Sequence, residues 1–210
     1  VYKRQTHGGW IHRLNMDSFP EQREMTKDDY VIVLGDFGIW RDSPQQRWYL
    51  NWLEEKHFTT LFIDGNHENY DILDSYPVEE WHGGKVHFIK PSIIHLMRGQ
   101  IFDIDGLKFF TFGGAASHDI SDGVLEIDDP RVKEWRDDPD KMYRINHISW
   151  WEREMPNQEE MDEGIKNLAE HNNKVDFILT HCTASSTAAL LSHGLYTVSY
   201  THLTLPTNSL

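Results

Sequence analysis

Three short apolar segments of the chain each end abruptly in polar side chains that can bind a metal ion. These segments span residues 30–34, 60–63 and 175–179 and are rich in strand-forming residues. Such runs, stopped by glycine or polar residues, are typical of strands buried on both faces of a sheet. In α/β folds, ligands gather beyond the carboxyl ends of these strands. We therefore expect a functional site at the residues that follow them, Asp36, Asn66, His67 and His181.

The segments between these strands carry helix and hairpin signals. Residues 45–56 follow a serine–proline pair and place apolar side chains on one face, which predicts an amphipathic helix. A second helix is expected over residues 157–172, because a capping box opens it. Residues 86–112 contain four apolar segments that we interpret as antiparallel strands, with a hairpin turn joining the last two. The whole pattern predicts an α/β fold with mixed sheets.

Composition narrows the class of protein. The 210 residues suffice for one domain with a single core. No segment approaches the roughly 20 consecutive apolar residues that a membrane helix needs, and a single cysteine suits a reducing compartment. The formal net charge of −14 argues against broad contact with nucleic-acid backbones. We therefore expect a soluble, cytoplasmic protein with neither membrane nor nucleic-acid partners.

The two ends of the chain share a coding pattern that unrelated natural termini would not share. Residues 1–5 and 198–202 can be encoded by opposite strands of one short DNA element. That element resembles the transposon end used in sequencing adapters, whose continuation would encode residues 204–207. We therefore expect residues 1–5 to be a non-native scar and residues 198–210 a non-native tail that packs poorly. Residues 6–197 would form a single domain, truncated at both ends.

The residue types at the strand ends favour a particular class of metal ion. Imidazole and carboxylate ligands together suit Mn, Fe or Zn better than Ca. The carboxylate of Asp36 can bridge two ions, because its two oxygens carry several lone pairs. Each residue alone also has an ordinary interpretation, since Gly-Asp after a strand is usually a turn and a lone histidine such as His181 usually makes a hydrogen bond. The specific signal is Gly-Asn-His-Glu at residues 65–68, directly after a buried strand.

Four short motifs, taken in order, are similar to those of the calcineurin-like metallophosphoesterases. They are Thr6-His7-Gly8, Gly35-Asp36, Gly65-Asn66-His67-Glu68 and Thr180-His181-Cys182. Their order and spacing agree over residues 6–196, and the third motif is highly specific. Gln5 stands where the family has an aspartate, and no Gly-His-x-His follows His181. The second motif also lacks the later aspartate that is common in the family.

The resemblance implies a fold of two packed mixed β-sheets flanked by helices, here incomplete at both termini. It also implies a centre of two divalent metal ions, in which His7 binds the first ion and Asn66 and His181 bind the second. Asp36 would bridge the two ions, which would be Mn, Fe or Zn. A hydroxide held between them would attack phosphorus in line, and His67 would protonate the leaving alkoxide or stabilise the transition state.

The expected function is therefore hydrolysis of a phosphate mono- or diester on a small molecule, a nucleotide or a phosphoprotein. The alternative is a catalytically impaired module of the same fold that binds a metal ion or phosphate, because the first ion would keep only His7 and Asp36. A nucleotidyl-handling enzyme of unrelated chemistry is disfavoured, since the chain lacks a glycine-rich phosphate loop ending in Lys-Ser or Lys-Thr.

A few other residues are expected to have structural roles. Trp48 and Trp52 share one face of the first predicted helix, which places them in the core. Residues 126–143 are charged and interrupted by proline, which indicates a surface excursion. Arg144 directly follows this excursion. Its guanidinium could contact a substrate phosphate, but we expect it in a surface ion pair with the nearby acids.

Overall fold

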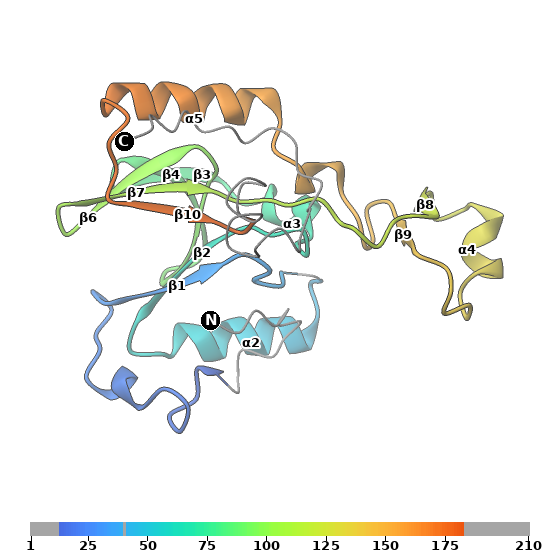
Figure 1. Ribbon diagram of the computed structural model, residues 1–210. Helices are drawn as coiled ribbons and strands as arrows, with labels where there is room; N and C mark the ends of the chain where they lie inside the picture. Colours follow the sequence, from blue (N-terminus) through green and yellow to red (C-terminus); the bar gives the residue numbers. More distant parts are fainter. Residues whose placement is uncertain (1–12, 40, 183–210) are drawn as a thin grey trace, which may run out of the picture.

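The computed structural model describes residues 13–39 and 41–182, which form four layers in the order helix, sheet, sheet, helix (Figure 1). The first sheet contains, in spatial order, β1 (Tyr30–Leu34), β2 (Thr59–Ile63), β5 (Ile93–Leu96), β4 (Gly84–Lys90) and β3 (Val78–Trp81). The second contains β10 (Phe177–Thr180), β7 (Leu107–Phe112) and β6 (Gln100–Ile104). Helix α2 (Pro44–Glu54) packs on the first sheet and α5 (Gln158–Glu170) on the second. The expected α/β fold of two packed sheets flanked by helices is confirmed.

Both large sheets are mixed, as the sequence predicts. In the first, β1, β2 and β5 are mutually parallel, whereas β4 is antiparallel to both β5 and β3. In the second, β10 is parallel to β7 and β7 is antiparallel to β6. Strand β5 was expected to be antiparallel to its neighbours. It is antiparallel to β4 but parallel to β2. Because β1 and β2 are parallel, their carboxyl ends lie side by side at one edge of the first sheet. The carboxyl ends of β7 and β10 likewise lie side by side at one edge of the second sheet.

Strand alternation divides the apolar residues among three cores. Along β2, Leu61 and Ile63 pack between the two sheets, whereas Phe62 packs toward α2. Along β6, Phe102 joins the core between the sheets and Ile101 packs with residues of α5. Successive side chains of a strand point to opposite faces, so each strand serves two cores. Burying each large apolar side chain contributes about 1.5–3 kcal/mol.

Capping residues fix where the two long helices begin. The hydroxyl of Ser43 accepts a hydrogen bond from the backbone N–H of Gln46, and Pro44 occupies the first turn of α2. Asn157 and Glu160 form the expected capping box at the start of α5, each side chain accepting from the other's backbone N–H. Both helix starts therefore follow from local side-chain chemistry.

Two expectations about burial are wrong. Leu34 of β1 and Phe177 of β10 are each about half exposed, at 49% and 48%, although both strands were expected to be buried. Within the described residues, β1 and β10 are edge strands with a sheet neighbour on one side only. Fully buried strands need neighbours and cover on all sides, and β2, which has them, is buried along its whole length.

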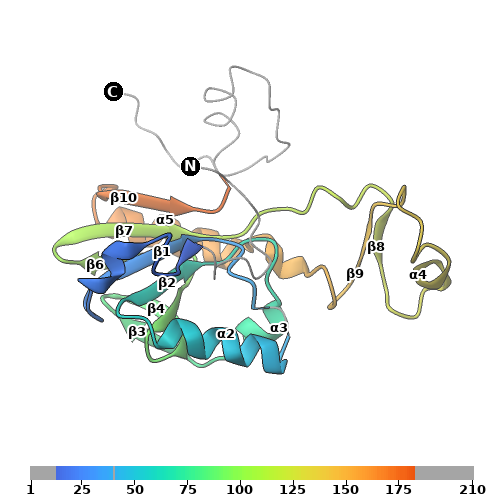
Figure 2. The same cartoon turned by 90° about the horizontal axis from the view of Figure 1, so that it is seen from below.

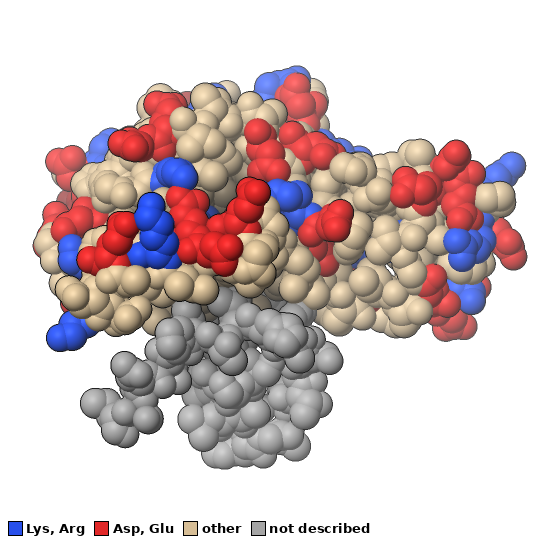
Figure 3. Space-filling view, turned by 90° about the horizontal axis from the view of Figure 1, so that it is seen from above, with Lys and Arg blue, Asp and Glu red and all other residues tan. Residues whose placement is uncertain are grey.

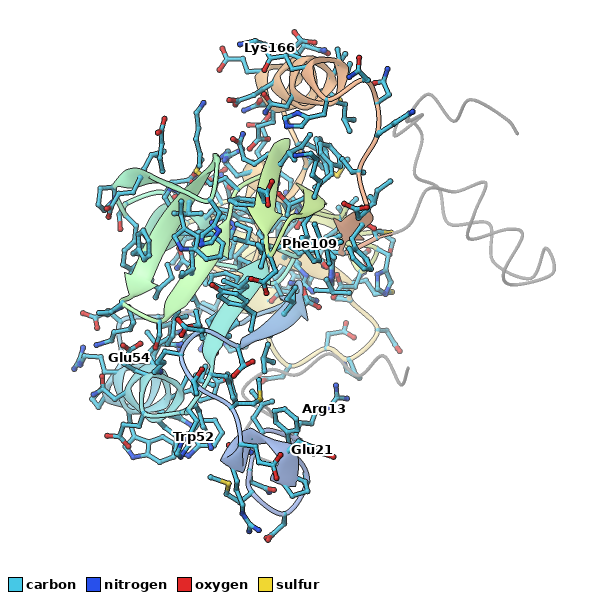
Figure 4. All side chains as sticks on the ribbon, turned by 90° about the vertical axis from the view of Figure 1, so that its left-hand side faces the viewer. Arg13, Glu21, Trp52, Glu54, Phe109 and Lys166 are labelled. Atoms are coloured by element: carbon cyan, nitrogen blue, oxygen red, sulfur yellow. The ribbon has the colours of Figure 1, made fainter. Side chains whose placement is uncertain are left out.

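A third expectation, that Trp48 lies in the core, is also wrong. Trp48 is 54% exposed, because the face of α2 that packs on the sheet carries Tyr49, Leu50 and Leu53 instead. Trp52 is partly buried at the edge of this core, where its ring stacks on Tyr49. Figure 4 labels Trp52 on this helix. The apolar stripe is therefore offset from the tryptophan pair.

A two-stranded extension projects from the body of the molecule (Figures 1 and 2). This segment, residues 118–150, is called the arm here; it contains β8 (Gly123–Leu125), α4 (Pro130–Glu134) and β9 (Tyr143–Ile145). Strands β8 and β9 pair in parallel, and the ring of Trp135 packs edge-on against Tyr143. The expected surface excursion is confirmed, and it is more ordered than a loop.

The face that includes α5 is acidic. Figure 3 shows side chains of aspartate and glutamate over this face, with lysines and arginines interspersed among them. The first turn of α5 carries Glu159 and Glu160, which suit the positive end of the helix dipole.

Candidate metal centre

The loops that follow β1, β2, β7 and β10 meet at one place. An added Cβ on Gly35, after β1, would lie 2.1 Å from Nδ1 of His181, after β10. An added Cβ on Gly113, after β7, would lie 2.3 Å from Oδ1 of Asp64, after β2. The strand ends of both sheets therefore converge, as the sequence predicts, and the absence of side chains at these glycines allows it.

Asp36 and His181 face each other at this convergence. Oδ1 of Asp36 lies 3.3 Å from Nε2 of His181. Nδ1 of the same imidazole lies 2.8 Å from the backbone oxygen of Leu34, which can only accept, so Nδ1 carries the hydrogen. In the neutral ring, Nε2 then presents a lone pair to the carboxylate. The lone pairs of His181 Nε2 and Asp36 Oδ1 would repel each other unless a proton or a cation lies between them. The two side chains are therefore suited to bind a divalent metal ion.

Gly65 leaves the space in which this pair meets. An added Cβ would lie 2.3 Å from Oδ1 of Asp36 and 3.0 Å from Nε2 of His181. Contacts below about 3 Å are not tolerated by packed atoms. The glycine of the third motif is therefore required by close approach to both side chains.

We predict that Gly35→Ala destabilises the protein more than Gly38→Ala. Both glycines have φ of +88°, so both substitutions carry the same strain of about 1–2 kcal/mol. Only at Gly35 does the new methyl group collide with His181, which adds an overpacking cost of about 1–3 kcal/mol. Gly38 has no heavy atom within 4 Å of the added Cβ and is the matched control. Equal losses of unfolding free energy in urea would contradict the placement of His181.

Asn66 and His67, which directly follow Gly65, are buried. The backbone N–H of His67 donates to Oδ1 of Asp36 at 3.1 Å, and Nδ2 of Asn66 donates to Oγ of Ser117 at 3.2 Å. The structure thus brings together the second, third and fourth motifs. His7 lies outside the described residues. Over residues 13–39 and 41–182, no group of three or more His, Cys, Asp or Glu side chains is arranged to hold a metal ion, so a complete site here needs the amide of Asn66 or further ligands.

Glu68 ties the third motif to the second. Its fully buried carboxylate accepts hydrogen bonds from the backbone N–H groups of Phe37, Gly38 and Ile39, at 2.5, 2.9 and 3.1 Å. Burial raises the pKa of Glu68 to about 8, against the opposing effect of these three hydrogen bonds. The loop after Asp36 is therefore held by a side chain that follows β2. This role of Glu68 was not predicted from the sequence.

A buried ion pair lies beneath the third motif. Asp64 accepts from Nε and Nη2 of Arg98 at 2.8 and 2.5 Å, and the hydroxyl of Tyr70 lies 2.9 Å from Asp64 Oδ2 and 2.6 Å from the backbone oxygen of Gly65. Burial alone would raise the pKa of Asp64, but the Arg98 charge and hydrogen bonds from His95 and Arg98 hold it well below its usual range. This network fixes the backbone on which Asn66 and His67 stand, and it was not predicted.

Arg144 forms an ion pair, as expected, but its partner is Asp119 rather than an acid of residues 126–143, and its side chain is only 11% exposed. Its guanidinium forms two hydrogen bonds to Asp119, at 2.9 and 2.8 Å, within the arm. Its third contact is to the backbone oxygen of Ser149. Arg144 therefore has a structural role in the arm.

Comparison with known protein families agrees with this geometry. The family model of calcineurin-like phosphoesterases matches residues 6–193, which is most of the chain. The chain therefore belongs to the calcineurin-like phosphoesterase family, whose members hydrolyse phosphoesters with the help of divalent metal ions. No match was found among curated proteins or among solved structures. Across the residues that the structure describes, none of the helices has the length and apolar character to cross a membrane.

Proposed function

We propose that this chain hydrolyses a phosphate mono- or diester at a centre of two divalent metal ions. The observation that carries the proposal is the contact between Asp36 Oδ1 and His181 Nε2, two metal-binding atoms from different sheets, 3.3 Å apart beside the third motif. When bound, the ions would neutralise the anionic ester and acidify the attacking water. Family membership supports this chemistry in general, and the two-metal form and the roles below are our inference.

Each residue has a distinct task in this proposal. Asp36 would hold both ions through its carboxylate, while Asn66 and His181 would hold the second ion through Oδ1 and Nε2. His7 would hold the first ion. His181 is well oriented for its task, because its other nitrogen donates to a backbone oxygen, the usual support of a histidine ligand. The metal would be Mn, Fe or Zn, which this mixture of donors favours.

His67 holds a proton for the leaving group. Its backbone N–H donates to Oδ1 of Asp36, and the residue is buried. A proton donor so placed would protonate the alkoxide as the bond from phosphorus to oxygen breaks. The substrate would be a phosphorylated small molecule, nucleotide or phosphoprotein in the cytoplasm. The formal net charge of −14 disfavours nucleic acid.

The alternative function is a module that binds metal or phosphate without turnover. The observation that favours it is the first motif, where Gln5 replaces the aspartate of the family. With this ligand absent, the first ion would be held weakly and the attacking water would lose one of its two cations. The chain as written would then hydrolyse aryl phosphates slowly or not at all.

Manganese binding tests the proposal directly. We expect the chain to bind Mn²⁺ measurably in equilibrium dialysis with metal analysis, and we expect Asp36→Ala to abolish binding, because Asp36 would contact both ions. Asp42→Ala is the matched control, since Asp42 lies in the same loop but is exposed and forms its ion pair with Arg47 on the surface. Gln5→Asp should raise the metal content toward about two ions per chain, the number in two-metal sites. Absence of Mn²⁺ binding in the unmodified chain and in the Gln5→Asp variant alike would contradict the proposal.

A further inference from the structure

The contacts of Asn66 extend away from the proposed metal centre through two more buried side chains. Nδ2 of Asn66 donates to Oγ of Ser117 at 3.2 Å, and Oγ of Ser117 donates to Oε2 of Glu154 at 2.8 Å. All three side chains are buried, and Glu154 is only 1% exposed. Asn66 follows β2, Ser117 precedes the arm, and Glu154 lies in η2 (Glu152–Glu154) beyond it. Three separate segments thus form one chain of hydrogen bonds, called the relay here.

The direction of these hydrogen bonds follows from the chemistry of the groups. An ionised carboxylate can only accept, so the hydroxyl hydrogen of Ser117 points to Glu154. Oγ of Ser117 then offers only lone pairs to Asn66, which must turn its NH₂ group toward it. The other end of the amide, Oδ1, therefore points away from Ser117. Burial raises the pKa of Glu154, and the hydrogen bonds that it accepts from Ser117 and Trp150 oppose that shift.

We propose that Glu154 and Ser117 are positioning residues that select which end of the Asn66 amide faces the metal ion. This inference rests on the proposed function, in which Oδ1 of Asn66 binds the second ion. An amide can bind a cation only through its oxygen, and rotation by a half-turn would present the NH₂ group to the ion instead. The relay removes that rotated state, because rotation would place Oδ1 against the lone pairs of Ser117.

A single isosteric substitution reverses the relay. Oε1 of Glu154 accepts two N–H donors, from the backbone of Ser117 at 2.6 Å and from Nε1 of Trp150 at 3.0 Å. In Glu154→Gln, these two donors keep the carbonyl oxygen at the Oε1 position. The new NH₂ group then occupies the Oε2 position and donates to Ser117. The Ser117 hydroxyl becomes free to donate to Asn66, which favours the rotated amide.

The test is the affinity of the full chain for Mn²⁺ alone, measured from the electron paramagnetic resonance signal of the unbound ion. We expect Glu154→Gln to weaken binding by roughly 10–100-fold, the usual effect of losing support for a metal ligand. Glu152→Gln, which makes the same charge change at an exposed position two residues away, should leave the affinity unchanged. Thermal unfolding of the metal-free variants shows whether the folded state is retained.

A double-mutant cycle separates positioning from a general loss of structure. Ser117→Ala should also weaken Mn²⁺ binding, and Glu154→Gln should add nothing in that background, because the relay is already interrupted. The cycle remains informative if Glu154→Gln lowers stability. A loss of Mn²⁺ affinity caused by instability would appear both in the unmodified chain and in Ser117→Ala. Affinity losses that add, or no loss in either single variant, would overturn the relay.

The same titration separates this inference from the proposed function. If the unmodified chain binds Mn²⁺ and Asp36→Ala abolishes binding, the metal centre stands, and an unaffected Glu154→Gln overturns the relay alone. If neither the unmodified chain nor Gln5→Asp binds Mn²⁺, the proposed function fails. The relay then fails with it, because Asn66 would have no ion to face.

Discussion

Replacement of His67 by alanine is expected to slow phosphoester hydrolysis by roughly 10²–10⁴-fold, the usual contribution of a positioned proton donor. The comparison requires a chain with good basal turnover, so it is made in a chain that carries Gln5→Asp and the C-terminal Gly-His-x-His motif of the family. In the proposed mechanism, His67 supplies the proton to the leaving alkoxide but binds no metal. Hydrolysis of an aryl phosphate with Mn²⁺ measures the rate, and metal analysis measures the ions bound.

The number of bound metal ions distinguishes a proton donor from a metal ligand at position 67. We expect His67→Ala to retain the same number of bound ions, whereas a ligand would lose them. His57→Ala, at an exposed histidine next to the end of α2, should change neither quantity. If the restored enzyme is fast and indifferent to loss of His67, the mechanism is wrong even though the family is right.

Removal of the Arg98 side chain is expected to lower the free energy of unfolding by about 3–5 kcal/mol, the usual cost of breaking a buried ion pair. Arg98→Ala would leave the carboxylate of Asp64 buried without its charged partner. The side chains of Arg98 and Asp64 are only 3% and 1% exposed, so water cannot replace the lost contact. Urea denaturation of the metal-free protein measures the change.

An exposed pair provides the comparison. Arg47 forms an ion pair with Asp42, and both side chains are more than half exposed. Arg47→Ala should therefore change the free energy of unfolding by less than about 1 kcal/mol. A loss of similar size at both arginines would show that the network beneath the third motif does not hold the fold as described.

The parts of the fold that the sequence predicts well have local causes. Strands β5 and β7 form within residues 86–112, where the sequence predicts apolar strands, because apolar runs and turn residues define them. Helix α5 begins at its capping box. The exposure of Leu34 was not predicted, because a sequence pattern shows that a strand is apolar and does not show whether it has neighbours on both sides. Strands β3, β8 and β9 were missed, since each has only three or four residues, too few to show a pattern.

In the candidate site too, residues with a local sequence signal were predicted, whereas contacts between distant segments were not. Asp36 and His181 are far apart in sequence, yet the rule that ligands follow the carboxyl ends of strands marks both as candidates, each at the end of a strand in its own sheet. Ser117 lies 51 residues from Asn66, and Glu154 lies 37 residues further on. No strand end or spacing marks Ser117 or Glu154. Their partnership depends on where the arm leaves and rejoins the body, which only the three-dimensional structure shows.

The arm leaves and rejoins the body at adjacent points. The backbone N–H of Ser117, just before the arm, donates to Glu154, a few residues after it, at 2.6 Å. The two ends of the arm are thus held together by a contact between residues of the body, which does not depend on the sequence of the arm. The entropy of closing a loop grows only with the logarithm of its length, so each doubling costs about 0.6 kcal/mol. Insertions, deletions and substitutions in the arm should therefore change the free energy of folding little. The strand ends would stay in register while the arm changes in evolution.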